Sequence, residues 1–266
     1  MSFLWRNYTR IGFCADRLIV AGYRRGLRPA LSGEHIVAVD ARGATATKAP
    51  APHWQAAADA LPDAIRQANA RKTDVTVILS NQFVRYALLP ANPALKTEEE
   101  WLAFARHRLT AVHGNAVADW ALRSSPATPR GPRVVGAVDK ALVASMRARI
   151  EDAGASLVSV QPFLIAAFNR TRETCSPSCW LVVAEAGRLT LALIQQGVLH
   201  AIRSRRVDHR WQAMLPEILE REGALLALGE PCTQAVVYTH EQLDSSAHAT
   251  IQLSAQSYQN LTLAWG

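Results

Sequence analysis

The residues best suited to catalysis are eight histidines, four cysteines and a run of three glutamates at 98–100. His107 and His113 lie on a predicted helix, and their spacing places them on different faces. Asp208 and His209 are adjacent in the sequence, but no nucleophile lies nearby. The chain contains no GxSxG, Walker, HExxH or dinucleotide-binding motif. These residues therefore do not indicate an enzyme of a known motif class.

The cysteines and the glutamate run favour structural roles. Only two of the four cysteines are close in sequence, in the segment CSPSC at 175–179. A zinc site would need two more ligands, and no Cys or His pair has the matching spacing. We therefore expect reduced, structural cysteines and no metal. The glutamates at 98–100 begin a predicted helix, where negative charge is favourable, so a helix N-terminus is favoured over a metal cluster.

Composition predicts a folded chain that does not bind nucleic acid. Its 266 residues are 49% hydrophobic, enough to fill a sizeable core. The formal net charge is +7, but the basic residues are scattered, without the basic stripe and aromatic strand of nucleic-acid-binding proteins. The N-terminal segment MSFLWRNYTR has no secretory apolar run, and no stretch of about 18 apolar residues occurs. We expect a cytoplasmic chain.

The hydrophobic pattern predicts two similar halves of mixed α/β structure. Each half begins with three strands in a meander and continues with helices and further strands. In the first half we expect a hairpin at 10–26, strands at 35–40, 74–80, 83–90, 133–138 and 155–162, and helices at 53–72, 96–114, 140–152 and 163–172. In the second half we expect three strands within 179–207, a helix at 209–228, and strands at 234–240, 249–254 and 260–265.

Three segments resemble consecutive blocks of the PilM and GspL-type proteins. The first, VTVILSNQFVRYALLPANPALKTEEEWLAFARHRL, has a strand, a small polar step, a strand ending in LP and an acidic helix start. The second, RVVGAVDKALVASMRARIEDAGASLVSVQPFLIAAFNR, alternates strand and helix, with AG between them. The third, WLVVAEAGRLTLALIQQGVLHAIRSRRV, resembles the family's second meander. The similarity runs from about residue 10 to 222.

The resemblance implies a two-lobed actin-like (ASKHA) fold. On that basis we expect a first lobe at 1–172 and a second lobe at 173–266. An inserted subdomain at about 83–154 would leave the first lobe at the polar step Ser80-Asn81-Gln82. Only about 45 residues follow the 209–222 region, so the second lobe should be reduced.

The resemblance also implies a function and partners. Family members are scaffolds on the cytoplasmic face of the bacterial inner membrane, in type IV pilus assembly or type II secretion. They connect membrane components to a cytoplasmic secretion ATPase. We therefore expect peripheral membrane association and recruitment by the short cytoplasmic tail of an inner-membrane assembly protein. The site favoured for that tail lies near Arg85, Tyr86 and Arg108, between the first lobe and the insertion.

Actin-like proteins hold ATP and magnesium at two hairpin turns, where small residues allow close approach of phosphates and an Asp holds the metal. In the first turn here, Cys14 occupies the Asp position and Asp16 the glycine turn. The second turn keeps a partial likeness in Glu185, Gly187 and Thr190. The resemblance therefore implies a degenerate pocket without a cofactor and without ATPase activity. Two alternatives remain: an active ATPase of this fold, and an unrelated α/β protein-binding module.

Overall fold

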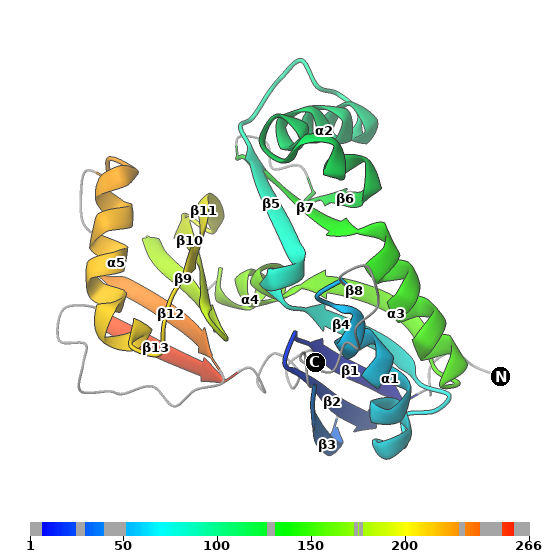
Figure 1. Cartoon of the computed structure of the whole chain (residues 1–266). Helices are drawn as coiled ribbons and strands as arrows, with labels where there is room; N and C mark the ends of the chain where they lie inside the picture. Colours follow the sequence, from blue (N-terminus) through cyan, green and yellow to red (C-terminus); the bar gives the residue numbers. More distant parts are fainter. Residues whose placement is uncertain are drawn as a thin grey trace.

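The computed structural model describes residues 7–24, 30–39, 52–126, 131–172, 175, 178–228 and 232–239, and the backbone of 252–257. These residues form two five-stranded sheets and one three-stranded sheet. Figure 1 shows the two large sheets in separate lobes, with the small sheet above the first lobe.

The first lobe is built on a sheet with the strand order β3-β2-β1-β4-β8. Its strands are β1 (Tyr8–Phe13), β2 (Arg17–Arg24), β3 (Ala30–Ala38), β4 (Asp74–Leu79) and β8 (Ser156–Pro162). The first three form the predicted antiparallel meander, and β4 and β8 are added in parallel beside β1. Helices α1 (Gln55–Gln67) and α3 (Lys140–Asp152) pack together over one face of this sheet.

The second lobe repeats this topology, with the strand order β11-β10-β9-β12-β13. Its strands are β9 (Ser178–Glu185), β10 (Arg188–Gln195), β11 (Val198–Arg206), β12 (Gln234–Thr239) and β13 (Gln252–Ser257). Helix α5 (Trp211–Leu225) covers its outer face. The predicted division into two related halves is therefore confirmed. Within the described residues, the second lobe has no inserted layer, as expected for a reduced lobe.

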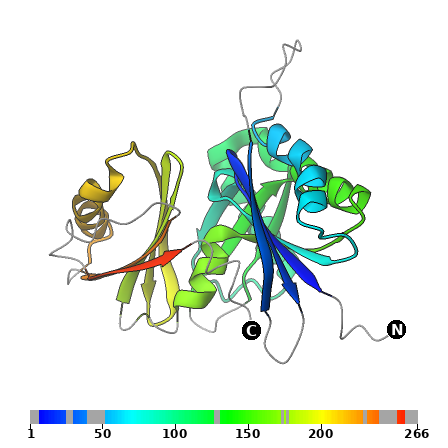
Figure 2. The ribbon, with the colours of Figure 1, turned by 90° about the horizontal axis from the view of Figure 1, so that it is seen from below.

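Alternating burial along β9 explains how the second sheet joins the first lobe. Trp180 and Val182 pack toward α5, whereas Leu181 and Val183 pack on the opposite face. That opposite face meets helix α4 (Phe163–Thr171), which lies between the two large sheets (Figure 2). The buried side chains of α4, together with Ile19 and Ile78 of the first sheet, complete one core shared by both lobes.

The inserted layer is a three-stranded sheet with the order β5-β7-β6. It contains β5 (Val84–Leu89), β6 (Trp120–Ser124), β7 (Arg133–Asp139), helix α2 (Glu98–His113) and the 3-10 helices η2 (Asn81–Phe83) and η3 (Gly114–Asp119) at its edges. Helix α2 starts with the predicted capping box between Thr97 and Glu100. Its buried side chains pack against the sheet as predicted: Trp101, Ala105 and Leu109, with Phe104 partly buried. Strand β6 was not predicted.

Helix α3 lies inside the range expected for the insertion, 83–154, but it packs in the first lobe. Its buried residues Leu142, Met146 and Ile150 belong to the same core as Leu61 of α1. The strands β5 to β7 and α2 have a core of their own. We therefore propose that the insertion ends at Asp139, the last residue of β7 and the N-cap of α3.

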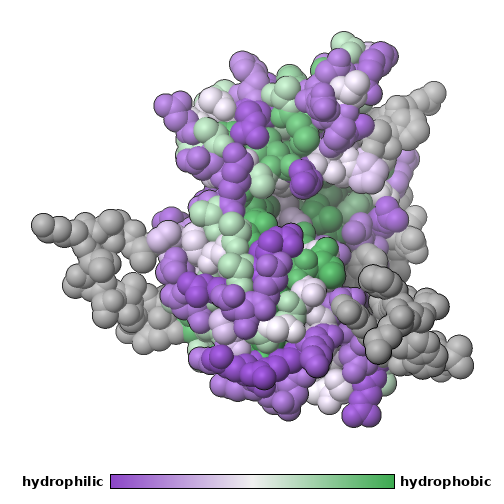
Figure 3. All heavy atoms as spheres, turned by 90° about the vertical axis from the view of Figure 1, so that its right-hand side faces the viewer, coloured by the Kyte–Doolittle hydropathy of each residue, from purple (hydrophilic) through white to green (hydrophobic). Residues whose placement is uncertain are grey.

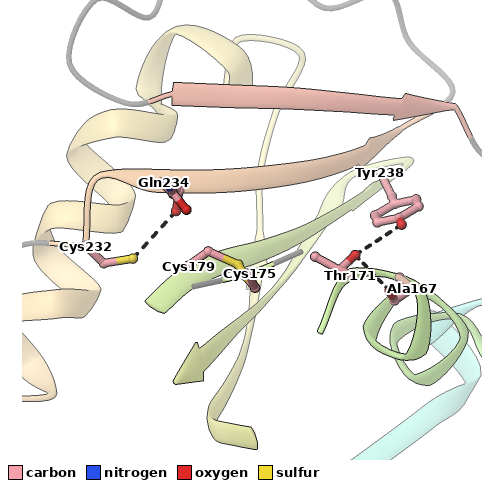
Figure 4. Close-up of a disulfide and its surroundings, with 7 residues drawn as sticks. All are labelled: Ala167, Thr171, Cys175, Cys179, Cys232, Gln234 and Tyr238. Atoms are coloured by element: carbon pink, nitrogen blue, oxygen red, sulfur yellow. Dashed lines mark hydrogen bonds between the residues drawn. A yellow bond between two sulfur atoms is a disulfide. The ribbon is translucent and has the colours of Figure 1, made fainter. Parts of the chain in front are cut away.

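The structure corrects one expectation about the cysteines. Cys175 and Cys179 form a disulfide, with their Cα atoms 5.6 Å apart (Figure 4), so the prediction of reduced cysteines is wrong for this pair. The chain turns back after α4, because the Cys175 N–H donates to the Thr171 carbonyl at 3.1 Å, and this brings Cys175 beside the start of β9. Cys14 and Cys232 take no part in a disulfide.

Candidate functional site

The first hairpin turn, Cys14 to Arg17, is closed and carries side chains. The Cys14 N–H donates to the Arg17 carbonyl at 3.1 Å, and the Val39 N–H donates to the Asp16 carbonyl at 2.8 Å. The Asp16 carboxylate is partly exposed and pairs with Arg17 at 2.7 Å. No residue of this turn has a positive φ, and Cys14 is buried in the core between the lobes. The turn therefore presents a carboxylate where a phosphate would need free N–H groups.

The second hairpin turn joins β9 to β10 through Gly187, whose φ of 70° favours glycine. Glu185 and Arg188 face each other across the turn. The Arg188 guanidinium donates to the Ser204 hydroxyl at 3.0 Å. Thr190 is 1% exposed, and its hydroxyl has no hydrogen-bond partner among the described residues. The carboxyl group of Glu185 reaches across to the first lobe.

Asn81 is the residue that receives Glu185, and it connects four parts of the fold. Its backbone N–H donates to Glu185 Oε2 at 3.1 Å. Its side-chain Oδ1 accepts from the Leu164 N–H of α4 at 3.1 Å and from the Tyr86 hydroxyl of β5 at 2.6 Å. Asn81 is 2% exposed. One buried residue thus links the end of β4, the inserted layer, α4 and the second lobe.

Neighbouring residues hold Asn81 in place. The Ser80 N–H donates to the Phe13 carbonyl at 2.9 Å, which keeps the end of β4 beside β1. The Ser80 hydroxyl accepts from the Gln82 N–H at 3.1 Å and caps the 3-10 turn η2. Gln82 then donates to the Ala186 carbonyl of the second hairpin at 3.1 Å. We call these contacts of Ser80–Gln82, Leu164 and 185–186 the interlobe junction.

Burial changes the acid–base properties of the interlobe junction. It raises the pKa of Glu185 to about 7, although contacts with the Ser80 hydroxyl and the Asn81 N–H partly oppose the shift. One carboxyl oxygen of Glu185, Oε1, is buried and has no hydrogen-bond partner among the described residues. Burial, together with the nearby Glu185, also raises the pKa of Tyr86 well above its usual value.

The structure brings together some of the residues that the sequence analysis selected. Glu185, Thr190 and Cys14 all lie between the lobes, whereas Asp16 and Gly187 lie in the turns themselves. The sequence analysis did not select Asn81 as a site residue. It named Asn81 only as part of the polar step at which the chain enters the insertion. A run of three polar residues directly after a buried strand was the signal for its role.

The three residues selected for partner binding do not line one groove. Tyr86 is bonded to Asn81, and Arg85 donates to the carbonyls of Gln82 and Val84, both at 3.2 Å. Adjacent residues of a strand point to opposite faces, so these two side chains diverge. Arg108 is exposed on α2.

A groove of about 740 Å³ separates the inserted layer from the first lobe. Strands β6 and β7 line it from the inserted layer, and α3, β8 and α4 line it from the first lobe; residues 197–199 of the second lobe complete the lining. Within the described part of the chain, β8 is an edge strand, so one of its edges is unpaired. The face in Figure 3 is hollowed between the upper, inserted part and the lower part of the molecule, and apolar surface gathers there.

The lining of this groove is apolar and basic. Val158 of β8 is 59% exposed, and it is the residue skipped where the register of β8 against β4 shifts between Leu157 and Ser159. The lining contains no Asp or Glu among the residues that the structure describes. Its charged residues are Arg123, Arg147 and Arg172.

Two further features are absent from the part of the chain that the structure describes. No helix among them is both long and apolar enough to cross a membrane. No group of three or more His, Cys, Asp and Glu side chains among them is arranged to hold a metal ion.

Comparison with known proteins identifies the fold. No protein-family model matches the sequence. No curated protein matches it either. Among solved structures, a chain of a PilM–PilN type IV pilus biogenesis complex superposes with a TM-score of 0.66 at 16% identity, over 98% of this chain and 90% of that one. The chain has the two-lobed actin-like fold.

Two other structures support this fold. The cytoplasmic domain of EpsL, an inner-membrane component of the type II secretion system of Vibrio cholerae, has a TM-score of 0.62 at 12% identity, with 97% and 92% of the two chains covered. A Bacteroides thetaiotaomicron protein with an actin-like ATPase fold and unknown function has a TM-score of 0.61 at 8% identity, with 96% and 94% covered. The predicted actin-like architecture is therefore confirmed.

Replacing Asn81 with alanine should strongly destabilise the protein. The variant leaves the Leu164 N–H and the Tyr86 hydroxyl without their acceptor. Each buried group left unpaired costs about 1–3 kcal/mol, so for these two groups we expect the free energy of unfolding in urea to fall by about 2–6 kcal/mol. The control is Asn115→Ala at an exposed position, with an expected change below about 0.5 kcal/mol. Equal effects of the two substitutions would contradict the role of Asn81.

Replacing Glu185 with glutamine should remove a pH dependence of stability. The unfolded chain releases this proton near pH 4.5 and the folded protein near pH 7. The protonated carboxyl therefore stabilises the fold fully below about pH 4.5, and this contribution is lost as the pH rises through 7. Relative to Glu185→Gln, the wild type should lose roughly 3 kcal/mol of unfolding free energy across this range.

Urea denaturation at several pH values measures this difference. Glu217→Gln is the matched control, because Glu217 is exposed on α5. The control should show the same pH dependence as the wild type. A constant difference between wild type and Glu185→Gln at every pH would show that the carboxyl is not buried.

Proposed function

We propose that this protein is a scaffold of a bacterial inner-membrane assembly platform, of the type IV pilus or type II secretion kind, and that it has no ATPase activity. The observation that carries the proposal is the interlobe junction. The Asn81–Glu185 and Gln82–Ala186 hydrogen bonds join the two lobes directly, at the second hairpin turn. The likeness in fold to a PilM–PilN complex and to the EpsL cytoplasmic domain supports the kind of assembly.

The chemistry of both turns disfavours ATP with magnesium. A phosphate approaching the first turn would meet the Asp16 carboxylate, and like charges repel. Glu185, the acidic residue of the second turn, accepts a hydrogen bond from Asn81, and burial favours its neutral form. A magnesium ion needs ionised or strongly polar oxygen ligands with room for water.

The active-ATPase alternative would require this junction to open. The alternative of an unrelated α/β module does not fit the shared strand order of the two sheets.

We propose that the scaffold works at the cytoplasmic face of the membrane. The net charge of +7 favours weak attraction to anionic lipid. Attraction of this kind adds to a specific protein contact and does not replace it. A cytoplasmic secretion ATPase is a second proposed partner.

The specific contact in this proposal is a short, extended cytoplasmic tail bound in the groove between the inserted layer and the first lobe. An extended peptide can add to the unpaired edge of β8 through main-chain hydrogen bonds. The apolar lining suits apolar side chains, and the exposed Val158 lies along this path. Arg123, Arg147 and Arg172 favour an acidic group in the tail, although Arg147 also pairs with Glu151 at 3.6 Å on the exposed side of α3. The groove replaces the site near Arg85, Tyr86 and Arg108 as our candidate.

Reversing two charges in the groove should release the protein from membranes. We expect wild-type protein to sediment with membranes of its own host, and an Arg123→Glu/Arg147→Glu variant to lose most of this retention. Both arginines line the groove, and the substituted glutamates would repel an acidic tail. Arg108→Glu, an exposed change on α2 outside the groove, is the control and should be retained.

Folding of each variant is checked by its thermal unfolding midpoint. Failure of the wild type to sediment with any membrane fraction would contradict the recruitment proposal. Equal retention of the folded double variant and the wild type would show that the tail binds elsewhere.

A further inference from the structure

The Cys175–Cys179 disulfide lies where the chain passes from the first lobe to the second. Among the described elements this passage occurs once, between α4 and β9. Cys175 follows α4, and its N–H donates to the Thr171 carbonyl at 3.1 Å, whereas Cys179 is the second residue of β9 (Figure 4). The bond therefore joins the end of the interlobe helix to the first strand of the second lobe.

Both ends of the disulfide lie close to residues that line the groove. On the α4 side, Arg172 lines the groove three residues before Cys175. On the β9 side, Cys179 is paired with Ile194 of β10, close to the turn that leads into β11. Residues 197–199 of that turn and strand line the groove from the second lobe. The disulfide thus connects two pieces of the groove that come from different lobes.

The two pieces meet at one end of the groove. A β-carbon placed on Gly197 would lie 3.8 Å from the carbonyl oxygen of Arg172, so the turn lies against the end of α4. Leu199 is buried, as are both cysteines, in the core that the lobes share. Movement of Cys179 away from Cys175 would therefore shift one wall of the groove relative to the other.

The main effect of this disulfide is local. It closes a ring that spans only 175–179, and a short ring removes less freedom from the unfolded chain than a long one. An extended chain could separate residues four apart by about 13 Å. The bond holds the two Cα atoms at 5.6 Å. The apolar core around it remains when the bond is broken, so we expect the reduced protein to stay folded.

We propose that the Cys175–Cys179 disulfide is a redox-sensitive clamp, and that its reduction loosens the second-lobe end of the groove. Weaker binding of the tail is the expected consequence. That consequence rests on the proposed function, whereas the clamp itself does not. A cytosolic location, as proposed above, exposes the protein to thiols that reduce most disulfides, so both states of the clamp would be accessible there.

The chemical step is thiol–disulfide exchange with a dithiol reductant. A thiolate of the dithiol attacks one cysteine sulfur, and the S–S bond breaks to give a mixed disulfide. The second thiol of the dithiol then displaces the remaining cysteine. The dithiol is oxidised to a disulfide, and its two protons pass to the thiolates of Cys175 and Cys179. Because both cysteines are buried, exchange also requires a local opening at the end of α4.

Hydrogen exchange of the full chain, measured by mass spectrometry, tests the clamp without any tail. We expect dithiothreitol to reduce the pair and oxidised glutathione to restore it, as alkylation of Cys175 and Cys179 reports. Reduction should speed amide exchange in 194–199 by about tenfold or more. Exchange in β4, which is paired on both sides, should stay unchanged. Thermal unfolding confirms that the reduced protein is folded.

Two variants serve as controls for the clamp. Cys175→Ala/Cys179→Ala should show fast exchange in 194–199 with and without dithiothreitol. Cys232→Ser should respond to dithiothreitol like the wild type, because Cys232 takes no part in a disulfide. Unchanged exchange in 194–199 after complete reduction overturns the proposal. A pair that stays oxidised in excess dithiothreitol, or a protein that unfolds when the pair is reduced, overturns it as well.

Sedimentation with membranes of the protein's own host tests the consequence for the tail. Protein that was reduced and then freed of dithiothreitol should be retained severalfold less than oxidised protein. Equal retention of the two forms would show that the clamp does not control tail binding. Absence of retention in both forms would contradict the recruitment proposal, while the exchange measurements would still decide the clamp.

Discussion

The arrangement of the lobes depends on the hydrogen bonds made by the backbone N–H and the side-chain Oδ1 of one buried polar residue, Asn81, whose Nδ2 has no partner among the described residues. A buried polar group left without a partner costs free energy, so the groups around Asn81 must stay where they are. Its N–H needs Glu185 of the second lobe, and its Oδ1 serves α4 and the inserted layer. Any rotation of the lobes that separates Asn81 from Glu185 breaks the hydrogen bond between the Asn81 N–H and Glu185 Oε2. The same contact brings the second hairpin turn against the first lobe, at the turn where nucleotide-binding members of this fold hold phosphate.

Apolar packing gives this contact its rigid surroundings. Helix α4 lies between the two large sheets and contributes Phe163 and Leu164 to the core that they share. The Thr171 hydroxyl of α4 accepts from or donates to the Tyr238 hydroxyl of β12 at 3.1 Å, and the disulfide lies in the same region (Figure 4). The second sheet therefore contacts the first lobe in two ways. Apolar side chains join the lobes in the shared core around α4, and hydrogen bonds join them at the second hairpin turn.

Much of the fold could be predicted from the sequence, because strand and helix periodicity is a local property. The two meanders, the capping box of α2 and the buried face of Trp101, Ala105 and Leu109 follow from such patterns. Strand β6 has five residues and one buried side chain, too weak a pattern to detect. The disulfide, the role of Asn81 and the groove depend on contacts between distant segments. Arg123, Arg147 and Arg172 belong to three neighbourhoods of the chain, and only the folded structure shows that they line one surface.

The proposed scaffold function would need a fixed geometry more than a chemical cycle, and the interlobe junction supplies such a geometry. The most direct test is hydrogen exchange at the Asn81 amide, measured by NMR with and without magnesium-ATP. Its acceptor lies on the other lobe, so exchange at this amide reports separation of the lobes. We predict protection comparable to that of Val77 in the central strand β4, unchanged by magnesium-ATP. Exchange as fast as in an exposed loop, or protection that disappears when magnesium-ATP is added, would contradict the account.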